Sequence, residues 1–338
     1  MPSRAFIPST VSAAFCLLLL GVGPADSAQG YQHFIVGNPA DVVTPTSGLL
    51  VLQGGGTDVD ENFVRMGASA GGGDFVVIRA SGTDAYNPYI FGLCSCDSVA
   101  TIIFKNRQAA FNPFVIDTIR NAEALFIAGG DQSEYVAFWK NSPVEEAIHH
   151  VANKPAPVGG TSAGMAIMSE FVYSAMSNSS LTSAEGLADP FHRDMTLDRD
   201  FLGLSTLNGK ITDQHLQERD RMGRTVAFLA RLVRDGWTTE GRAIAADRET
   251  ALHVDPTNGE SEVLSTPTHP TPFVYFLRTP GPPEVCLPGT PLTYRNIAVY
   301  RLGPGGTFDL KRWRGTGGIS YTLTAEAGVL TSSRGDIY

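Results

Sequence analysis

The stretch APVGGTSAGMAIM, residues 156–168, combines a short apolar run, a Gly-x-Ser-x-Gly pattern centred on Ser162 and a second apolar run. A strand that enters such a turn and a helix that leaves it lift the serine hydroxyl onto a strained corner, where it can attack a carbonyl carbon. The amides that open the helix help to hold the negative charge that develops on the carbonyl oxygen. The stretch therefore predicts an α/β fold in which Ser162 is a nucleophile at the carboxyl end of a strand.

Residues 48–254 fit that fold, because short β-branched runs alternate with helical patterns along them. The expected strands lie in GLLVLQ, DFVVIRA, VATIIF, ALFIAGG, APVGG, GKITDQ and GRAIAAD. Strands separated by helices predict parallel crossovers and a sheet covered by helices on both faces. Ligands of such a sheet bind beyond the carboxyl ends of its strands, so the residues that directly follow strands are the candidates for a site.

The chain changes character after residue 255. Proline and glycine crowd residues 265–291, and two hairpin-like segments follow within residues 296–330. We read this part as a β-rich extension of the same domain. The sequence thus predicts a single domain over residues 29–338, with an α/β core at about 48–255 and the extension at about 256–338.

Residues 1–28 are expected to be a secretory signal peptide, because Arg4 precedes the apolar run VSAAFCLLLLGV and a small-residue stretch, GPADSAQG. The apolar run is shorter than the ~20 residues that a membrane-spanning helix needs. We therefore expect a secreted or periplasmic protein with no membrane association after signal removal. A net charge of −9 makes nucleic acid a poor partner.

Three cysteines follow the signal peptide, namely Cys94, Cys96 and Cys286. Export permits a disulfide, but an odd count leaves at least one thiol unpaired. No further Cys or His lies near the CSC stretch at metal-binding spacing. The sequence predicts at most one disulfide, leaves its pairing open and predicts no metal site.

A second Gly-x-Ser-x-Gly pattern, around Ser69, lies in MGASAGGG at residues 66–73. Here a helical pattern precedes the serine and a strand pattern follows it, which reverses the order that a nucleophile needs. The glycines supply the left-handed conformations of a helix-to-strand turn. We expect Ser69 to be structural.

A serine hydroxyl needs a base, so one histidine should follow a strand and face Ser162. His215 is placed where the strand pattern GKITDQ gives way to a helical pattern, and we expect it to be the base. His192, in a polar loop, stays possible. On helical spacing, His215 begins a stripe that continues through Arg219, Met222, Val226, Leu229 and Val233.

Arg221 and Arg224 lie near the start of the same expected helix, where the helix dipole disfavours positive charge. Such a cluster is stable beside an anion, and arginine binds carboxylates through two hydrogen bonds. The alternative is a surface network of these arginines with Asp213, Glu218 and Asp220.

Three ordered stretches, FIAGGDQ (126–132), GGTSAG (159–164) and DQHLQERDRMGR (213–224), resemble the cyanophycinase family, relatives of the aspartyl dipeptidase peptidase E. The similarity extends over about residues 48–313. It implies a homodimer with a flavodoxin-like three-layer sandwich, a mostly parallel sheet related to class I glutamine amidotransferases. It also implies a serine exopeptidase that releases β-aspartyl-arginine dipeptides from cyanophycin, a poly-aspartate whose side-chain carboxylates carry arginine. No cofactor is expected.

By position, Ser162 resembles the family's nucleophile and His215 its general base. The backbone amides of Gly130, Asp131 and Ala163 are the expected oxyanion donors, since they follow a strand or open a helix. Glu185 is the expected acid of the triad, with Asp189 as the alternative, because the family places an acid between the serine and the histidine in the chain.

The family's substrate-pocket positions match Gln132, Asp213, Gln214, Arg219, Arg221 and Arg224. Asp131 or Asp213 is expected to bind the guanidinium group of the substrate. One departure is Arg248 in AADRETAL, where relatives often have an acidic residue.

Two alternatives stay open, a peptidase of the same scaffold that acts on other aspartyl or isoaspartyl peptides and an inactive secreted binding protein. Gln214 and the three arginines favour the longer substrate over a dipeptide. A lipase or esterase is disfavoured, because the chain has no His-Gly oxyanion motif and the histidine follows the serine by only about fifty residues. A glutamine amidotransferase is disfavoured because those enzymes have a cysteine in place of Ser162.

Overall fold

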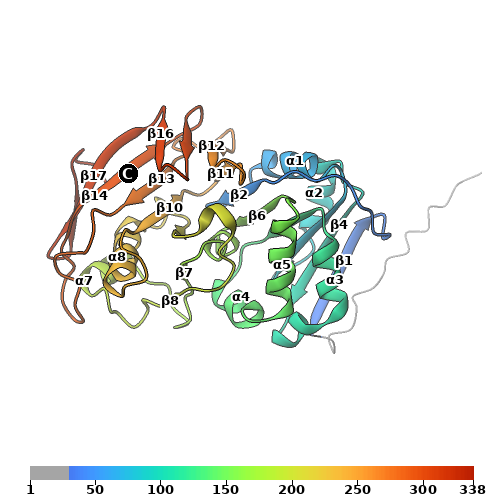
Figure 1. Cartoon of the computed structure of the whole chain (residues 1–338), viewed down its shortest axis with the longest axis horizontal. Coiled ribbons are helices and arrows are strands. Elements are labelled where there is room, and N and C mark those ends of the chain that lie inside the picture. The colour runs from blue at the N-terminus through green and yellow to red at the C-terminus, as the bar shows by residue number, and fades with distance from the viewer. Residues whose placement is uncertain (1–29) are drawn as a thin grey trace, which may run out of the picture.

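The computed structural model describes residues 30–338, which form two large β-sheets, a small two-stranded sheet and the helices packed against them (Figure 1). The signal peptide expected in residues 1–28 lies outside the described residues. No helix within residues 30–338 is long and apolar enough to cross a membrane.

The first sheet has ten strands, and its middle is parallel. In spatial order the strands are β1 (Tyr31–Gly37), β4 (Ser98–Phe104), β3 (Asp74–Arg79), β5 (Ala124–Ile127), β6 (Val158–Thr161), β2 (Leu50–Gln53), β11 (Thr250–Val254), β12 (Glu260–Ser265), β15 (Thr307–Asp309) and β16 (Arg314–Thr316). The five strands from β4 to β2 run parallel to one another, whereas β1 and β11 pair antiparallel with β4 and β2.

Alternate residues of the central strands face opposite helical layers. In β2, Val51 packs into one apolar cluster, whereas Leu50 and Leu52 pack into another. Helices α1 (Asp60–Ser69) and α2 (Tyr86–Cys94) complete the first cluster, and α3 (Pro113–Asn121), α4 (Gln132–Trp139) and α5 (Pro143–Asn153) complete the second. Burial on both faces is why these strands read as continuous apolar runs.

The second sheet has six strands and its own apolar core. In spatial order the strands are β18 (Val329–Ser332), β17 (Ile319–Glu326), β14 (Tyr294–Leu302), β13 (Val274–Arg278), β10 (Arg242–Ala246) and β9 (Ile211–Asp213). Helix α8 (Met222–Arg234) packs on this sheet through residues such as Val226 and Leu229, and α7 (Ser183–Ala188) packs against α8. The small sheet pairs β7 (Val172–Tyr173) with β8 (Leu197–Asp198).

The predicted fold class, α/β with a largely parallel sheet and a β-rich C-terminal part, is confirmed, and a strand forms in each of the seven expected stretches. One detail of the expected sheet is wrong. Strands β9 and β10 do pair in parallel, but they belong to the second sheet. Strand β11 pairs antiparallel with β2, so β9 and β10 cannot extend the first sheet from β2. Strand β10 pairs with β13 in the second sheet.

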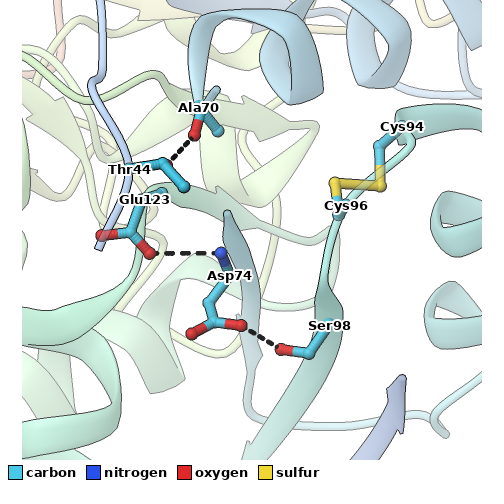
Figure 2. Close-up of a disulfide and its surroundings, with 7 residues drawn as sticks. All are labelled: Thr44, Ala70, Asp74, Cys94, Cys96, Ser98 and Glu123. Carbon is cyan, nitrogen blue, oxygen red and sulfur yellow. Dashed lines mark hydrogen bonds between the residues drawn. A yellow bond between two sulfur atoms is a disulfide. The ribbon is translucent and has the colours of Figure 1, made fainter. Parts of the chain in front are cut away.

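Cys94, the last residue of α2, forms a disulfide with Cys96 (Figure 2). Cys286 is a buried free thiol. Burial raises the pKa of the Cys286 thiol to about 11, so this thiol is protonated at neutral pH. The expectation of at most one disulfide is confirmed for these three cysteines.

The second Gly-x-Ser-x-Gly pattern forms the expected helix-to-strand turn. Helix α1 ends at Ser69, and Gly71 and Gly72 have φ angles of 60° and 72° before β3 begins at Asp74. The Thr44 hydroxyl donates to the Ala70 carbonyl at 2.5 Å and holds the N-terminal segment against this turn (Figure 2).

Gly164 lies where the short helix α6 (Ala163–Ala166) touches β5, and a Cβ atom built on it would lie 2.0 Å from the carbonyl oxygen of Ile127. We expect Gly164→Ala to lower the free energy of unfolding by at least about 1–3 kcal/mol, as overpacking of a tight contact does. The matched control is Gly92→Ala in α2, where an added Cβ meets nothing within 4 Å. Urea denaturation measures both changes, and equal effects of the two substitutions would contradict the close contact.

Candidate active site

Ser162 occupies the sharp turn between β6 and α6, as the sequence predicts. Its φ and ψ angles are 52° and −115°, a conformation that L-residues rarely adopt. Its amide donates to the carbonyl of Gln53 in the neighbouring strand β2 at 3.0 Å, which fixes the turn at the carboxyl edge of the parallel strands. The helix that follows has only four residues, shorter than the apolar pattern suggests, because Phe171 already forms a bridge to Ile211 of β9.

The His215 imidazole faces the hydroxyl of Ser162, with 3.0 Å between His215 Nε2 and Ser162 Oγ. The expected proximity of these two side chains is thereby confirmed. The histidine backbone is held by its amide, which donates to the carbonyl of Gly54 at 2.8 Å. His215 therefore reaches the serine from β9 of the second sheet, across the loop that follows β2.

The prediction that a helix begins at His215 is wrong. Helix α8 begins at Met222, and the residues between β9 and α8 form successive turns. His215 and Asp220 have φ angles of 52° and 47°, which a continuous right-handed helix cannot contain. The apolar part of the stripe, from Met222 to Val233, is helical and buried as expected.

The carboxylate beside His215 belongs to Glu218. Its Oε2 atom lies 2.6 Å from His215 Nδ1, which corrects the assignment of Glu185 or Asp189 to this position. Glu185 instead closes a capping box at the start of α7, where its Oε2 accepts from the amide and the hydroxyl of Thr182. Asp189 accepts from two backbone amides, those of Phe191 and Gly289.

Two backbone features keep the histidine and the glutamate in place. Gly55 has a φ of 99°, and a Cβ atom there would lie 2.2 Å from His215 Nε2, so the bare backbone leaves the room that the imidazole occupies. The amide of Glu218 donates to Oδ1 of the buried Asp247 at 3.4 Å, and the same oxygen accepts from the Arg248 amide at 2.9 Å. The loops after β2, β9 and β10 are thus tied together around the imidazole.

The electrostatics favour a neutral imidazole paired with an ionised carboxylate. Burial lowers the pKa of His215 from its usual 6.5, and the charges of Arg219 and Arg221 lower it further, against the raising effect of Glu218. Partial burial alone would raise the pKa of Glu218, but the hydrogen bond from His215 and the charges of His215, Arg219 and Arg248 together lower it. A neutral imidazole with its proton on Nδ1 can donate to Glu218 and accept from Ser162.

A polar cavity of about 260 Å³ opens beside Ser162. Seven of the residues expected at the site line it, and four more come from the loop before α7; the eleven are Gly130, Asp131, Gln132, Ser162, Ala175, Asn178, Ser179, Ser180, Gln214, Arg219 and Arg221. No sequence pattern marks the four loop residues, because small polar side chains are typical of any surface loop.

The loop after β5 contains two of the three amides expected to bind the oxyanion, those of Gly130 and Asp131, and the third, of Ala163, opens α6. The hydroxyl of Tyr135 lies 2.9 Å and 3.0 Å from the carbonyl oxygens of Ala128 and Gly129 and so fixes the backbone just before Gly130. Within residues 30–338, the amides of Gly130 and Asp131 have no acceptor. Asp131 caps α4 through Oδ1, which accepts from the amide and the hydroxyl of Ser133.

Asp213 and Arg224 were expected in the substrate pocket, but they lie behind its wall. Arg224 donates to both carboxylate oxygens of Asp213, at 3.0 Å and 2.5 Å, and each residue is 1% exposed. The Thr225 hydroxyl and the Gln214 amide also donate to this carboxylate, so it has no free oxygen for a guanidinium group. This pair shapes the pocket from inside the core.

Arg221 is different, because it is a buried cation without an anion. Its Nη1 donates to the carbonyl and the side-chain oxygen of Gln214, at 2.9 Å and 3.1 Å. No carboxylate within residues 30–338 lies in ion-pair distance of Arg221 or of its neighbour Arg219. Burial and the charge of Arg224 lower the pKa of Arg221 to about 10. The pocket wall therefore carries positive charge that an anionic ligand can neutralise.

The two buried arginines should respond differently to substitution. Arg224→Met leaves Asp213 buried without its cation, so we expect the free energy of unfolding to fall by about 3–5 kcal/mol. Arg221→Gln removes an unpaired cation, so we expect a change below about 1 kcal/mol in stability together with a KM at least about tenfold higher. Chemical denaturation and steady-state kinetics on both variants measure these effects, and the opposite pattern would contradict the assignment of the two arginines.

Known proteins match this chain in both sequence and fold. The model of peptidase family S51 matches residues 92–258. Cyanophycinases from Trichormus variabilis and from a Nostoc species are each 26% identical over 65% of this chain and 68% of their own length. A peptidase from an acI-B1 Actinobacterium shares the fold, with a TM-score of 0.52 at 15% identity over 78% of this chain and 98% of that one. The resemblance carried by the three sequence motifs is confirmed, and the matches to peptidase family S51 and to the cyanophycinases support a serine-type peptidase hydrolase.

Proposed function

We propose that the protein is a secreted serine exopeptidase that hydrolyses cyanophycin to β-aspartyl-arginine dipeptides. The observation that carries the proposal is the polar cavity beside Ser162, whose wall holds the unpaired cations Arg219 and Arg221. The names of the two cyanophycinase relatives support the choice of polymer. Each arginine of the polymer carries a free α-carboxylate and a guanidinium group, so the polymer needs a site with cations on one side and an acid on another.

The first half of the reaction forms an acyl-enzyme. Ser162 Oγ attacks the scissile carbonyl carbon while His215 Nε2 takes the hydroxyl proton and then passes it to the leaving amine. Glu218 accepts a hydrogen bond from Nδ1–H, orients the ring and stabilises the imidazolium that forms. The distances of 3.0 Å and 2.6 Å along this chain of side chains support these roles.

Backbone amides stabilise the oxyanion, and a water molecule completes the second half of the reaction. The amides of Gly130, Asp131 and Ala163 are the proposed donors to the negatively charged oxygen of the tetrahedral intermediate. A water molecule then attacks the acyl carbon, His215 takes its proton, and Ser162 leaves with that proton restored.

Substrate charges are divided between two sides of the pocket. Arg221 and Arg219 bind the free α-carboxylates of the polymer's arginine residues, and Gln132 and Gln214 supply neutral hydrogen-bonding groups. The exposed Asp131, whose Oδ2 makes no hydrogen bond within residues 30–338, binds the substrate guanidinium group. Asp213 cannot take that role, because its carboxylate is already paired with Arg224.

Export and assembly belong to the same proposal. The signal peptide within residues 1–28 directs the chain to the periplasm or the cell exterior, and the processed chain acts there as a homodimer without membrane association. N-terminal sequencing of the exported chain and light scattering on it test these two points.

The direct test incubates the purified processed chain with insoluble cyanophycin and with a panel of aspartyl and isoaspartyl dipeptides. We expect β-aspartyl-arginine to be released from the polymer, and the release to be lost in Ser162→Ala. Ser69→Ala is the matched control, since Ser69 lies in the same Gly-x-Ser-x-Gly pattern and should keep full activity. Cleavage of dipeptides alone would favour the alternative substrate class, and binding without cleavage would favour an inactive binding protein.

Glu218→Gln should lower kcat/KM by about 10²–10⁴-fold, because an amide cannot hold the same imidazole tautomer or stabilise the imidazolium. Asp189→Asn is the control, since an amide oxygen still accepts from the backbone at Phe191 and Gly289 and activity should be unchanged. Steady-state kinetics measure both. A loss of activity in Asp189→Asn with Glu218→Gln intact would return the triad acid to the segment between the serine and the histidine.

A further inference from the structure

Three side chains that the proposed reaction does not use converge beside α7. Glu185 lies on α7 itself, and His192 and Asp194 lie in the loop that follows it. One potential ligand atom from each lies within 4.8 Å of the other two. None of the three lines the cavity beside Ser162.

The buried, unpartnered carboxylate oxygen of Asp194 indicates that a ligand binds here. Its side chain is 4% exposed, and its buried Oδ1 atom has no hydrogen-bond partner within residues 30–338. A buried carboxylate oxygen without a partner is costly, because it has lost its water without gaining a donor. Nε of Arg193 lies 3.5 Å from this oxygen, beyond the distance of a good hydrogen bond. The Arg193 side chain is 83% exposed, so it can turn away into solvent.

The other two ligands are oriented by the chain. Nδ1 of His192 lies 3.7 Å from Asp194 Oδ2, a separation that two ligands of one metal ion can have, and its lone pair receives only a long bond of 3.3 Å from the Asp194 amide. The capping box fixes the carboxylate of Glu185 through Oε2 and leaves Oε1 without a hydrogen bond within residues 30–338. Such outer contacts orient metal ligands in known sites.

We propose that Glu185, His192 and Asp194 bind one divalent transition-metal cation of the Zn²⁺ or Mn²⁺ type. An imidazole nitrogen selects these ions over Ca²⁺, which takes oxygen ligands, and two carboxylates supply the negative charge that neutralises the ion. Water molecules complete the coordination shell. The proposal does not depend on the substrate or on the reaction at Ser162.

The bound ion stabilises the segment that supports the pocket wall. Arg224 donates to Ser180 Oγ at 3.1 Å and to the Leu181 carbonyl at 3.4 Å, just before α7. Ser183, in the first turn of α7, donates to the Asp220 carbonyl. Because the proposed site joins α7 to the following loop, a cation there holds the far end of the same segment. Its role is structural.

Isothermal titration of the metal-stripped, untagged chain with Zn²⁺, Mn²⁺ and Ca²⁺ tests the site. We expect one equivalent of Zn²⁺ or Mn²⁺ to bind, and His192→Ala and Asp194→Asn each to weaken it by at least about tenfold. Thermal unfolding is the second readout, since excess cation should raise the Tm of the wild type and not that of His192→Ala. Arg193→Gln removes the opposing charge and should bind the ion more tightly.

Two control variants separate this site from other histidines. His149 lines a surface cavity together with Glu145 and Glu146, so His149→Ala removes a comparable imidazole and should leave the equivalent bound. His215→Ala should also leave it, because the active-site imidazole is not a ligand. Failure of Zn²⁺ and Mn²⁺ to bind at millimolar concentration, undiminished binding in His192→Ala, or binding of Ca²⁺ alone would each overturn the proposal.

Discussion

The hydrogen bond between Ser162 and His215 depends on a close approach of three backbone segments that belong to two different sheets. Ser162 follows β6 and His215 follows β9, while Gly54 and Gly55, after β2, lie between them and hold the histidine. A side chain at residue 55 would occupy the space of the imidazole. The glycines after β2 are therefore as necessary for the site as the serine and the histidine.

The second constraint on the site is that the buried carboxylate of Asp213 pairs with only one of the two buried arginines, Arg221 and Arg224. Asp213 is fully paired with Arg224, and this buried pair leaves no anion for Arg221, which faces the cavity. Desolvation of an unpaired guanidinium group costs free energy, and an anionic ligand recovers part of that cost when it binds. The same cluster thus contains one arginine that is paired inside the core and one that faces the cavity without an anion.

The sequence predicted the parts of this structure that depend on local pattern. The turn at Ser162 and the strands around it follow from neighbouring residues, and His215 was found because it follows a strand. Glu218 escapes prediction because it follows His215 in the chain, whereas the family resemblance places the acid between the serine and the histidine. Thr182-x-x-Glu185 is itself a capping-box pattern, a local signal that Glu185 has another partner. The placement of β9 and β10 in a second sheet depends on strand pairing between distant segments, which no local pattern encodes.

The protonation state of His215 tests the central claim most directly. Nitrogen NMR of the chain labelled in histidine reports which ring nitrogen carries the proton and the pKa at which the ring becomes charged. The geometry and burial predict a neutral ring with its proton on Nδ1 and a pKa below the usual 6.5. A proton on Nε2 in the neutral form, or a pKa above 6.5, would contradict the role of this imidazole as the base that activates Ser162.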